Sequence, residues 1–94
     1  MTRAELLEKL RELKPWLEEQ GIVNVRLFGS YARDEAGPDS DVDLLVEMTK
    51  PLGFNFFSVE DELSDVLGAR VEMGTERAMH RLVRERILPE LIHV

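Results

Sequence analysis

Two aspartates at the start of an apolar run are the residues best suited to chemistry in this sequence. Asp41 and Asp43 directly precede the run Leu44-Leu45-Val46. In a strand, side chains two positions apart leave the same face, so these carboxylates would stand about 7 Å apart along the backbone. Mg²⁺ prefers one or two such carboxylates together with the phosphate oxygens of a substrate, and two ions can stabilise both the attacking and the leaving oxygen. The pair therefore predicts a metal-dependent site.

A Gly-Ser pair ends another apolar run, with ten residues between Ser30 and Asp41. A strand-to-helix turn at Gly29 and Ser30 would aim backbone N–H groups and the serine hydroxyl at a phosphate chain. An Asp-x-Asp alone is weak evidence, because loops that lead into strands are often acidic simply for solvation. The joint pattern is more specific. It predicts a site in which one half holds metal and the other holds phosphate.

Composition limits the alternatives. The 94 residues predict one domain, residues 1–94, without room for a second core. The chain has 12 basic and 19 acidic residues, and the net charge of −7 argues against binding to a nucleic-acid backbone and against a polymerase role. There is no cysteine, and we find neither a run of apolar residues long enough to span a bilayer nor a signal sequence. We therefore expect a cytoplasmic protein that does not contact a membrane.

The first half of the chain predicts a helix, a strand and a short helix. Thr2 and Glu5 have the spacing of a capping box, and leucines at helical spacing follow. Pro15 should kink or break this helix, because it removes a backbone donor and its ring clashes with the preceding turn. Residues 23–28 alternate as a strand whose more apolar face carries the odd-numbered positions, and a short helix should run from Ser30 to about residue 35.

The second half predicts two more strands and two helices. Residues 42–48 form a strand buried on both faces, and a crossover helix over 54–67 leads to a third strand over 69–73. Thr75 caps a last helix that Pro89 ends, and residues 91–94 form a tail or an edge strand. The inner side of this last helix is expected to carry Met79, Leu82, Val83, Arg86 and Ile87. We therefore expect an α/β (α+β) fold: a small mixed sheet of three to four strands, helices packed against it, and the site at the strand ends.

The stretches 27–33 and 40–46 resemble the signature of the nucleotidyltransferase superfamily related to DNA polymerase beta. The resemblance covers nearly the whole chain and is to the smallest form, the minimal nucleotidyltransferase (MNT) domain. It extends to MNT antitoxins, which are encoded beside HEPN-domain toxins. What it implies about fold and function is an analogy.

The resemblance implies roles for individual residues. Two Mg²⁺ ions would be held by Asp41, Asp43 and a third carboxylate, usually an aspartate, which holds metal or takes the proton from the attacking hydroxyl. The residue in the matching context here is Glu72. Its extra methylene fixes the carboxylate less tightly, and the other interpretation is an ordinary solvated strand residue. The implied nucleotide-binding residues are Gly29, Ser30, Arg33 and Ser40.

Three functional hypotheses follow. The first is an enzyme, a protein adenylyltransferase that transfers AMP from ATP to a hydroxyl, which the resemblance implies to be a tyrosine of a cognate HEPN toxin, so that the chain acts as an antitoxin. The second is a catalytically weak or inactive nucleotide-binding antitoxin that neutralises its partner by binding. The third is a small-molecule nucleotidyltransferase of the antibiotic-modifying kind, although these generally carry a further domain for the acceptor.

Other residues allow two interpretations. Arg33 either neutralises a bound triphosphate or pairs with Asp34 or Glu35 in solvent. Tyr31 is expected to pack, and both histidines, at positions 80 and 93, are expected at the surface because they have no companions at metal-ligand spacing. A basic stripe on the last helix is either a solvated face paired with the glutamates at 76 and 85 or a patch that binds a partner; it consists of Arg77, Arg81 and Arg84.

Overall fold

A four-stranded mixed sheet forms the centre of the molecule in the computed structural model, which describes residues 1–51, 53 and 55–94. The strand order is β3-β2-β1-β4, with β2 and β3 parallel and the other two pairs antiparallel. The predicted mixed sheet is confirmed. The strands are β1 (Ile22–Phe28), β2 (Val42–Met48), β3 (Val71–Gly74) and β4 (Ile92–His93).

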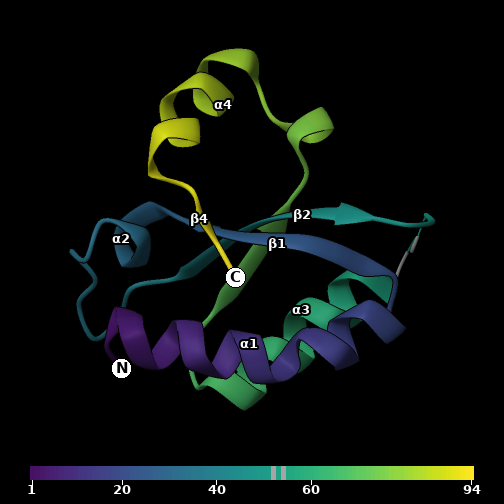
Figure 1. The fold of residues 1–94 in the computed structure, drawn as a ribbon, viewed down its shortest axis with the longest axis horizontal. Coiled ribbons are helices and arrows are strands. Elements are labelled where there is room, and N and C mark those ends of the chain that lie inside the picture. The colour runs from purple at the N-terminus through teal and green to yellow at the C-terminus, as the bar shows by residue number, and fades with distance from the viewer. Residues whose placement is uncertain (52, 54) are drawn as a thin grey trace.

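Helices lie on both sides of this sheet. Figure 1 shows α1 and α3 together on one side and α4 on the other. The parallel strands β2 and β3 are joined through α3, which is the predicted crossover helix. None of the helices in the described part of the chain is both long and apolar enough to cross a membrane. The helices are α1 (Arg3–Glu19), α2 (Gly29–Ala32), α3 (Asn55–Leu67), α4 (Arg81–Ile87) and the short 3₁₀ turns η1 (Glu76–Ala78) and η2 (Leu88–Glu90).

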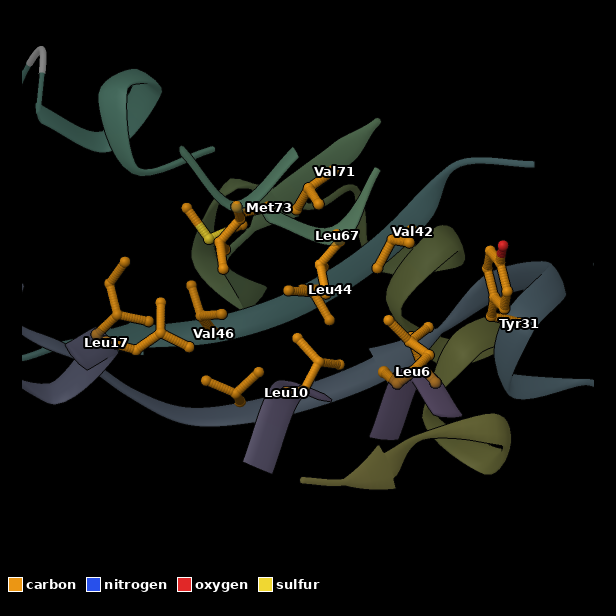
Figure 2. Close-up of a cluster of buried hydrophobic side chains, with 14 of the residues drawn as sticks. Leu6, Leu10, Leu17, Tyr31, Val42, Leu44, Val46, Leu67, Val71 and Met73 are labelled. Carbon is orange, nitrogen blue, oxygen red and sulfur yellow. The ribbon is translucent and has the colours of Figure 1, made fainter. Parts of the chain in front are cut away.

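The main hydrophobic core lies between the sheet and the pair α1 and α3. Val42, Leu44 and Val46 of β2 enter this core, and Leu45, on the other face of the strand, is also completely buried. The predicted burial of this strand on both faces is therefore confirmed. Figure 2 shows α1 and the sheet contributing to one cluster, which includes Leu6, Leu10, Leu17, Val42, Leu44, Val46, Val71 and Met73.

The first helix is longer than Pro15 led us to expect. The capping box at its start is present: the Glu5 N–H donates to the Thr2 hydroxyl at 3.1 Å, and the Thr2 N–H donates to the Glu5 carboxylate at 2.9 Å. However, α1 continues through Pro15, so the predicted break of the helix was wrong. Leu10 and Leu17, on either side of the proline, are completely buried, and their packing outweighs the loss of one backbone hydrogen bond.

A bulge in β1 changes which of its residues face the core. The pairing with β2 is irregular between Val23 and Arg26, and Asn24 has a φ of 50°. The extra residue shifts the alternation, so that Ile22 and Val25 are both buried although they are three positions apart. The predicted alternation therefore holds for the second half of the strand and fails before the bulge.

The segment from Thr75 to Leu91 also departs from the prediction. Thr75 caps the short turn η1, and α4 begins later, after His80, whose side chain accepts a hydrogen bond from Leu82 N–H at 3.2 Å. Ile87 is buried as predicted, but Leu82 and Val83 are 60% and 47% exposed, so the predicted inner face of this helix was wrong at these two positions. The final strand pairs with β1 as the predicted edge strand.

The crossover helix α3 buries the apolar residues that its helical spacing predicts, with one exception. Val59 and Leu63 are buried as the spacing predicts, but Val66 is 62% exposed. Gly68, with a φ of +69°, ends the helix in the left-handed conformation. The predicted first residue of this helix, Phe54, lies outside the described residues.

Candidate active site

The Gly-Ser turn packs directly against Asp43. Phe28 and Asp43 are partners in the pairing of β1 and β2, so the end of β1 lies beside the start of β2. Gly29 has a φ of +78°, and a Cβ atom at this position would collide with the Asp43 carboxylate. Only glycine satisfies both demands. The structure therefore brings together the two halves of the site that the sequence predicts.

Several contacts hold this turn in place. The Arg33 N–H donates to the Gly29 carbonyl at 3.1 Å and closes the single turn of α2. From α1, the Arg3 guanidinium donates to the Ala32 carbonyl at 3.1 Å. Tyr31 is 5% exposed and belongs to the core, which confirms its predicted packing role (Figure 2). The turn is thus anchored from the helical layer beneath it.

Three carboxylates meet around the start of β2. Asp43 and Glu72 are partners in the parallel pairing of β2 and β3, and Asp41 immediately precedes β2. Partial burial, followed by the negative charges of Glu72 and Asp41, raises the pKa of Asp43 to about 6 against the opposing effect of Arg33. The site therefore carries an excess of negative charge that a cation would neutralise.

This donor set suits a hard divalent cation that also binds substrate. The candidate ligands are carboxylate oxygens, which Mg²⁺ prefers. In the part of the chain that the structure describes, no group of three or more His, Cys, Asp or Glu residues is arranged to hold a metal ion by itself. Such an arrangement fits Mg²⁺, which commonly uses one or two carboxylates and takes its remaining ligands from water and substrate phosphates.

Glu72 lies on the correct strand but has another partner. Its neighbours Val71 and Met73 are buried in the core, so Glu72 projects from the opposite face, as Asp43 does. Its carboxylate forms an exposed ion pair with Arg70 at 3.0 Å. Exposed pairs of this kind contribute little free energy, so the pair leaves Glu72 available for a second role.

Arg33 forms two ion pairs, one of which the sequence did not predict. Its Nε atom pairs with Glu35 at 3.0 Å, as one interpretation expected. Its Nη1 atom pairs with Glu90 at 3.0 Å, and the second oxygen of Glu90 accepts a hydrogen bond from Gly29 N–H at 3.3 Å. No local motif marks Glu90, and the signal would have been the register of the edge strand β4 against β1.

The remaining predicted residues have local structural contacts. Ser40 accepts a hydrogen bond from Gly37 N–H at 2.8 Å within the loop before β2. In the basic stripe, Arg81 pairs with Glu85 at 3.9 Å, as the solvated-face interpretation expects. Glu76 was predicted to pair with the arginines of the basic stripe. It pairs instead with Arg26 of β1 at 2.7 Å, which corrects that prediction.

Comparison with known proteins places this geometry in a family. The family model for the nucleotidyltransferase domain matches residues 3–93. The chain belongs to the nucleotidyltransferase domain family. This chain is 38% identical over 96 residues to MJ0128 of Methanocaldococcus jannaschii, a candidate protein adenylyltransferase, with 99% of this chain and 98% of the relative covered. It is 33% identical to the protein adenylyltransferase MntA of Thermococcus cleftensis, with 100% and 97% covered.

Solved structures show the same nucleotidyltransferase fold. The structure of a candidate minimal nucleotidyltransferase superposes with a TM-score of 0.82 at 35% identity, and the match covers 100% of this chain and 97% of that one. A second structure, an MNT antitoxin in complex with a tri-AMPylated HEPN toxin from Shewanella oneidensis, matches with a TM-score of 0.60 at 17% identity. That match covers 97% of this chain and 66% of the other and shows the fold alone.

Proposed function

We propose that this chain is a Mg²⁺-dependent protein adenylyltransferase that transfers AMP from ATP to a tyrosine hydroxyl of a HEPN-domain toxin, and so acts as an antitoxin. The observation that carries the proposal is the packing of the Gly29 backbone onto the Asp43 carboxylate. This contact places a turn suited to phosphate beside carboxylates suited to metal. The adenylyltransferase relatives and the structure of an AMPylated HEPN toxin with its MNT antitoxin support a toxin protein as the acceptor. The tyrosine is what the family resemblance implies.

The nucleotide would lie across this junction. The Ser30 N–H and hydroxyl bind the phosphate chain, Gly29 shapes the turn that presents them while its own N–H donates to Glu90, and Arg33 neutralises charge on the phosphate oxygens. Ser40 completes the predicted set from the loop before β2. Asp41 and Asp43 would hold Mg²⁺, with Glu72 beside Asp43 as a third ligand or general base, and the ion would draw charge from the phosphate oxygens.

The reaction is a displacement at the α-phosphorus. The acceptor oxygen forms a bond to this phosphorus, the bond from the α-phosphorus to the oxygen that bridges to the β-phosphate breaks, and pyrophosphate leaves. The hydroxyl proton passes to a carboxylate. Glu72 is the residue assigned to this step, because it projects beside Asp43 and its ion pair with Arg70 is exposed.

A second candidate function is neutralisation by binding, with little or no catalysis. The observation that favours it is the exposed apolar surface on the segment after β3, where Leu82, Val83 and Leu88 are 60%, 47% and 45% exposed. Contiguous exposed apolar patches are typical of sites that bind another protein, and these three side chains lie on one short segment. The longer side chain of Glu72, in place of the usual aspartate, also leaves catalysis less strictly positioned.

A labelled-transfer experiment separates the two candidates. The chain is incubated with ATP labelled at the α-phosphate, Mg²⁺ and the HEPN-domain protein encoded beside it, and the product is located by mass spectrometry. We expect AMP on a tyrosine of the partner. The label should disappear with Asp43→Asn and with a chelator, because each removes the metal-binding function.

The outcomes differ clearly. A stable complex without label would favour neutralisation by binding. Label that persists in Asp43→Asn would contradict the assignment of the metal site, and the absence of nucleotide binding by the wild-type chain would refute the proposed function as a whole.

A further inference from the structure

Glu90 contacts two residues of the candidate nucleotide site, the turn glycine Gly29 and Arg33. One carboxylate oxygen accepts a hydrogen bond from Gly29 N–H at 3.3 Å, and the other pairs with Arg33 Nη1 at 3.0 Å. Glu90 belongs to η2, at the far end of the chain from both. A single side chain therefore links the phosphate-side turn to the phosphate-side arginine.

The strand register explains how Glu90 reaches this position. In the antiparallel pairing of β1 and β4, Arg26 lies opposite His93 and Leu27 opposite Ile92. Continuing this register beyond both strands places Glu90 opposite Gly29. The pairing of the edge strand β4 with β1 therefore places the Glu90 carboxylate at the end of β1, where the Gly-Ser turn begins.

The two ion pairs of Arg33 are not equivalent. The Glu35 side chain is 65% exposed, whereas that of Glu90 is 19% exposed. Solvent and salt weaken an exposed pair more than a shielded one, so Glu90 is the stronger restraint. Glu35 pairs with Nε and Glu90 with Nη1, so the guanidinium is held from two sides, and among the described residues no ion pair engages its Nη2 nitrogen.

We propose that Glu90 is a positioning residue of the nucleotide site, an inference that rests on the proposed function. Its carboxylate fixes the guanidinium plane of Arg33 and the Gly29 backbone relative to one another, so that both already stand in place when the phosphate chain arrives. Displacement of such groups by about 1 Å is enough to cost on the order of 100-fold in rate. A shielded supporting contact is the usual means of preventing it.

Substitution by glutamine tests this role, because glutamine keeps the shape but has only one acceptor oxygen for two donors. The dissociation constant for an ATP analogue with a methylene bridge between its α- and β-phosphates is measured by calorimetry with Mg²⁺. KM for ATP and kcat for AMP transfer are measured in parallel. We expect Glu90→Gln to lower kcat/KM by about 10- to 100-fold, mainly through weaker nucleotide binding.

Glu85→Gln is the matched control. Glu85 lies on α4, close to Glu90 in the sequence, and the substitution removes the same charge. Glu85 pairs with the exposed Arg81 at 3.9 Å and not with a residue of the candidate site, so we expect the nucleotide affinity and transfer rate of Glu85→Gln to stay within about 2-fold of wild type. An equal effect of the two substitutions would show a response to net charge and would overturn the proposal.

A double-mutant cycle with Arg33 separates positioning from general stability. In an Arg33→Ala chain, Glu90→Gln should change nucleotide affinity by less than it does in the wild-type chain, because only the contact with Gly29 remains to be lost. Should Glu90→Gln fail to fold at the assay temperature, Arg33→Lys tests the same link, since lysine keeps the charge but cannot hold both glutamates in one plane. We expect it to lose affinity too.

The negative results are distinguishable. A folded Glu90→Gln chain that binds the analogue as tightly as an active wild type, or more tightly, would overturn the role of Glu90 and leave the proposed function intact. Tighter binding would identify Glu90 as a competitor of the phosphates. A wild-type chain that neither binds nucleotide nor transfers AMP would instead refute the proposed function.

Discussion

Asp43 is the residue at which folding and the proposed chemistry conflict. Its side chain is partly buried against the backbone of Gly29, and the charges of Glu72 and Asp41 act on it. Each effect disfavours the ionised form, which is the form that binds a metal ion. Without a cation, the fold therefore carries an unfavourable charge at neutral pH, as expected for a residue kept for function rather than for stability.

We predict that Asp43→Asn stabilises the metal-free protein at neutral pH. The pKa of Asp43 is raised from 3.8 to about 6, so the favourable contribution of its protonated form is complete below about pH 4 and is lost as the pH rises through 6. Asparagine avoids this loss. The free energy of unfolding in urea should be about 1–2 kcal/mol higher than that of wild type at pH 8, after allowance for partial exposure. The two proteins should converge at pH 4.

Asp61→Asn provides the control, because Asp61 is exposed on α3, which covers the face of the sheet opposite to the one from which Asp43 projects. The substitution removes the same charge and should not reproduce the stabilisation of Asp43→Asn at pH 8. A loss of stability in Asp43→Asn at pH 8 would mean that the carboxylate has a structural role, and the metal assignment would lose its main support.

At the scale of elements, Arg26 shows how β1 is joined to the segment after β3. Arg26 is 5% exposed, its Nε donates to the carbonyl of Asn24 in the bulge at 3.2 Å, and its Nη1 pairs with Glu76 at 2.7 Å. Its buried Nη2 atom has no partner among the described residues. A buried cation with one carboxylate partner is sensitive to the loss of that partner.

We predict that Glu76→Ala destabilises the protein by about 1–3 kcal/mol in chemical denaturation. The substitution leaves the Arg26 charge buried, and the cost stays below that of a completely buried pair because the Glu76 side chain is 39% exposed and water can partly replace it. Glu85→Ala, which breaks the exposed pair with Arg81, should cost less than about 1 kcal/mol.

A third variant checks the cause. Replacing Arg26 by methionine in the Glu76→Ala chain removes the buried charge and should recover most of the lost stability. If this double variant is no more stable than Glu76→Ala alone, the loss arises from the η1 turn itself and not from the unpaired arginine.

Elements were predictable from the sequence where local patterns and packing agree. The strand at β2 was predicted with its observed bounds, and the crossover helix agrees apart from one exposed valine and its first residue, which the structure does not describe. The failures have tertiary causes. Burial on both sides of Pro15 keeps α1 continuous, and a bulge at Asn24 shifts β1. Neither leaves a periodic signal in the sequence.

The same distinction applies to the site. Asp43 and the Gly-Ser turn are close in the sequence and flank elements that pair, so their meeting could be predicted. Glu90 comes from the other end of the chain and enters the site through the register of a two-residue edge strand, β4. Such a contact depends on strand order, which spacing and composition do not reveal.

At the scale of the whole molecule, the candidate site joins segments from most of the chain. The end of β1, the start of β2, β3 and the segment before β4 all contribute a charged or backbone group. A ligand that contacts them together binds the folded chain and not the unfolded one, so its binding free energy adds to the global stability. A ligand that contacted a single loop could stay bound while other parts of the chain unfold, and it would then add less to the global free energy of unfolding.

We therefore predict a large thermal shift that requires metal and nucleotide together. At about 100 times its dissociation constant, the methylene-bridged ATP analogue with Mg²⁺ should add about 2.7 kcal/mol, which for a domain of this size raises Tm by roughly 10 °C or more. The shift is measured by differential scanning calorimetry. It should be lost with a chelator and in Asp43→Asn, because negative phosphates then meet Asp41, Glu72 and Glu90 without a bridging cation. A shift of equal size in Asp43→Asn would place the nucleotide elsewhere on the protein.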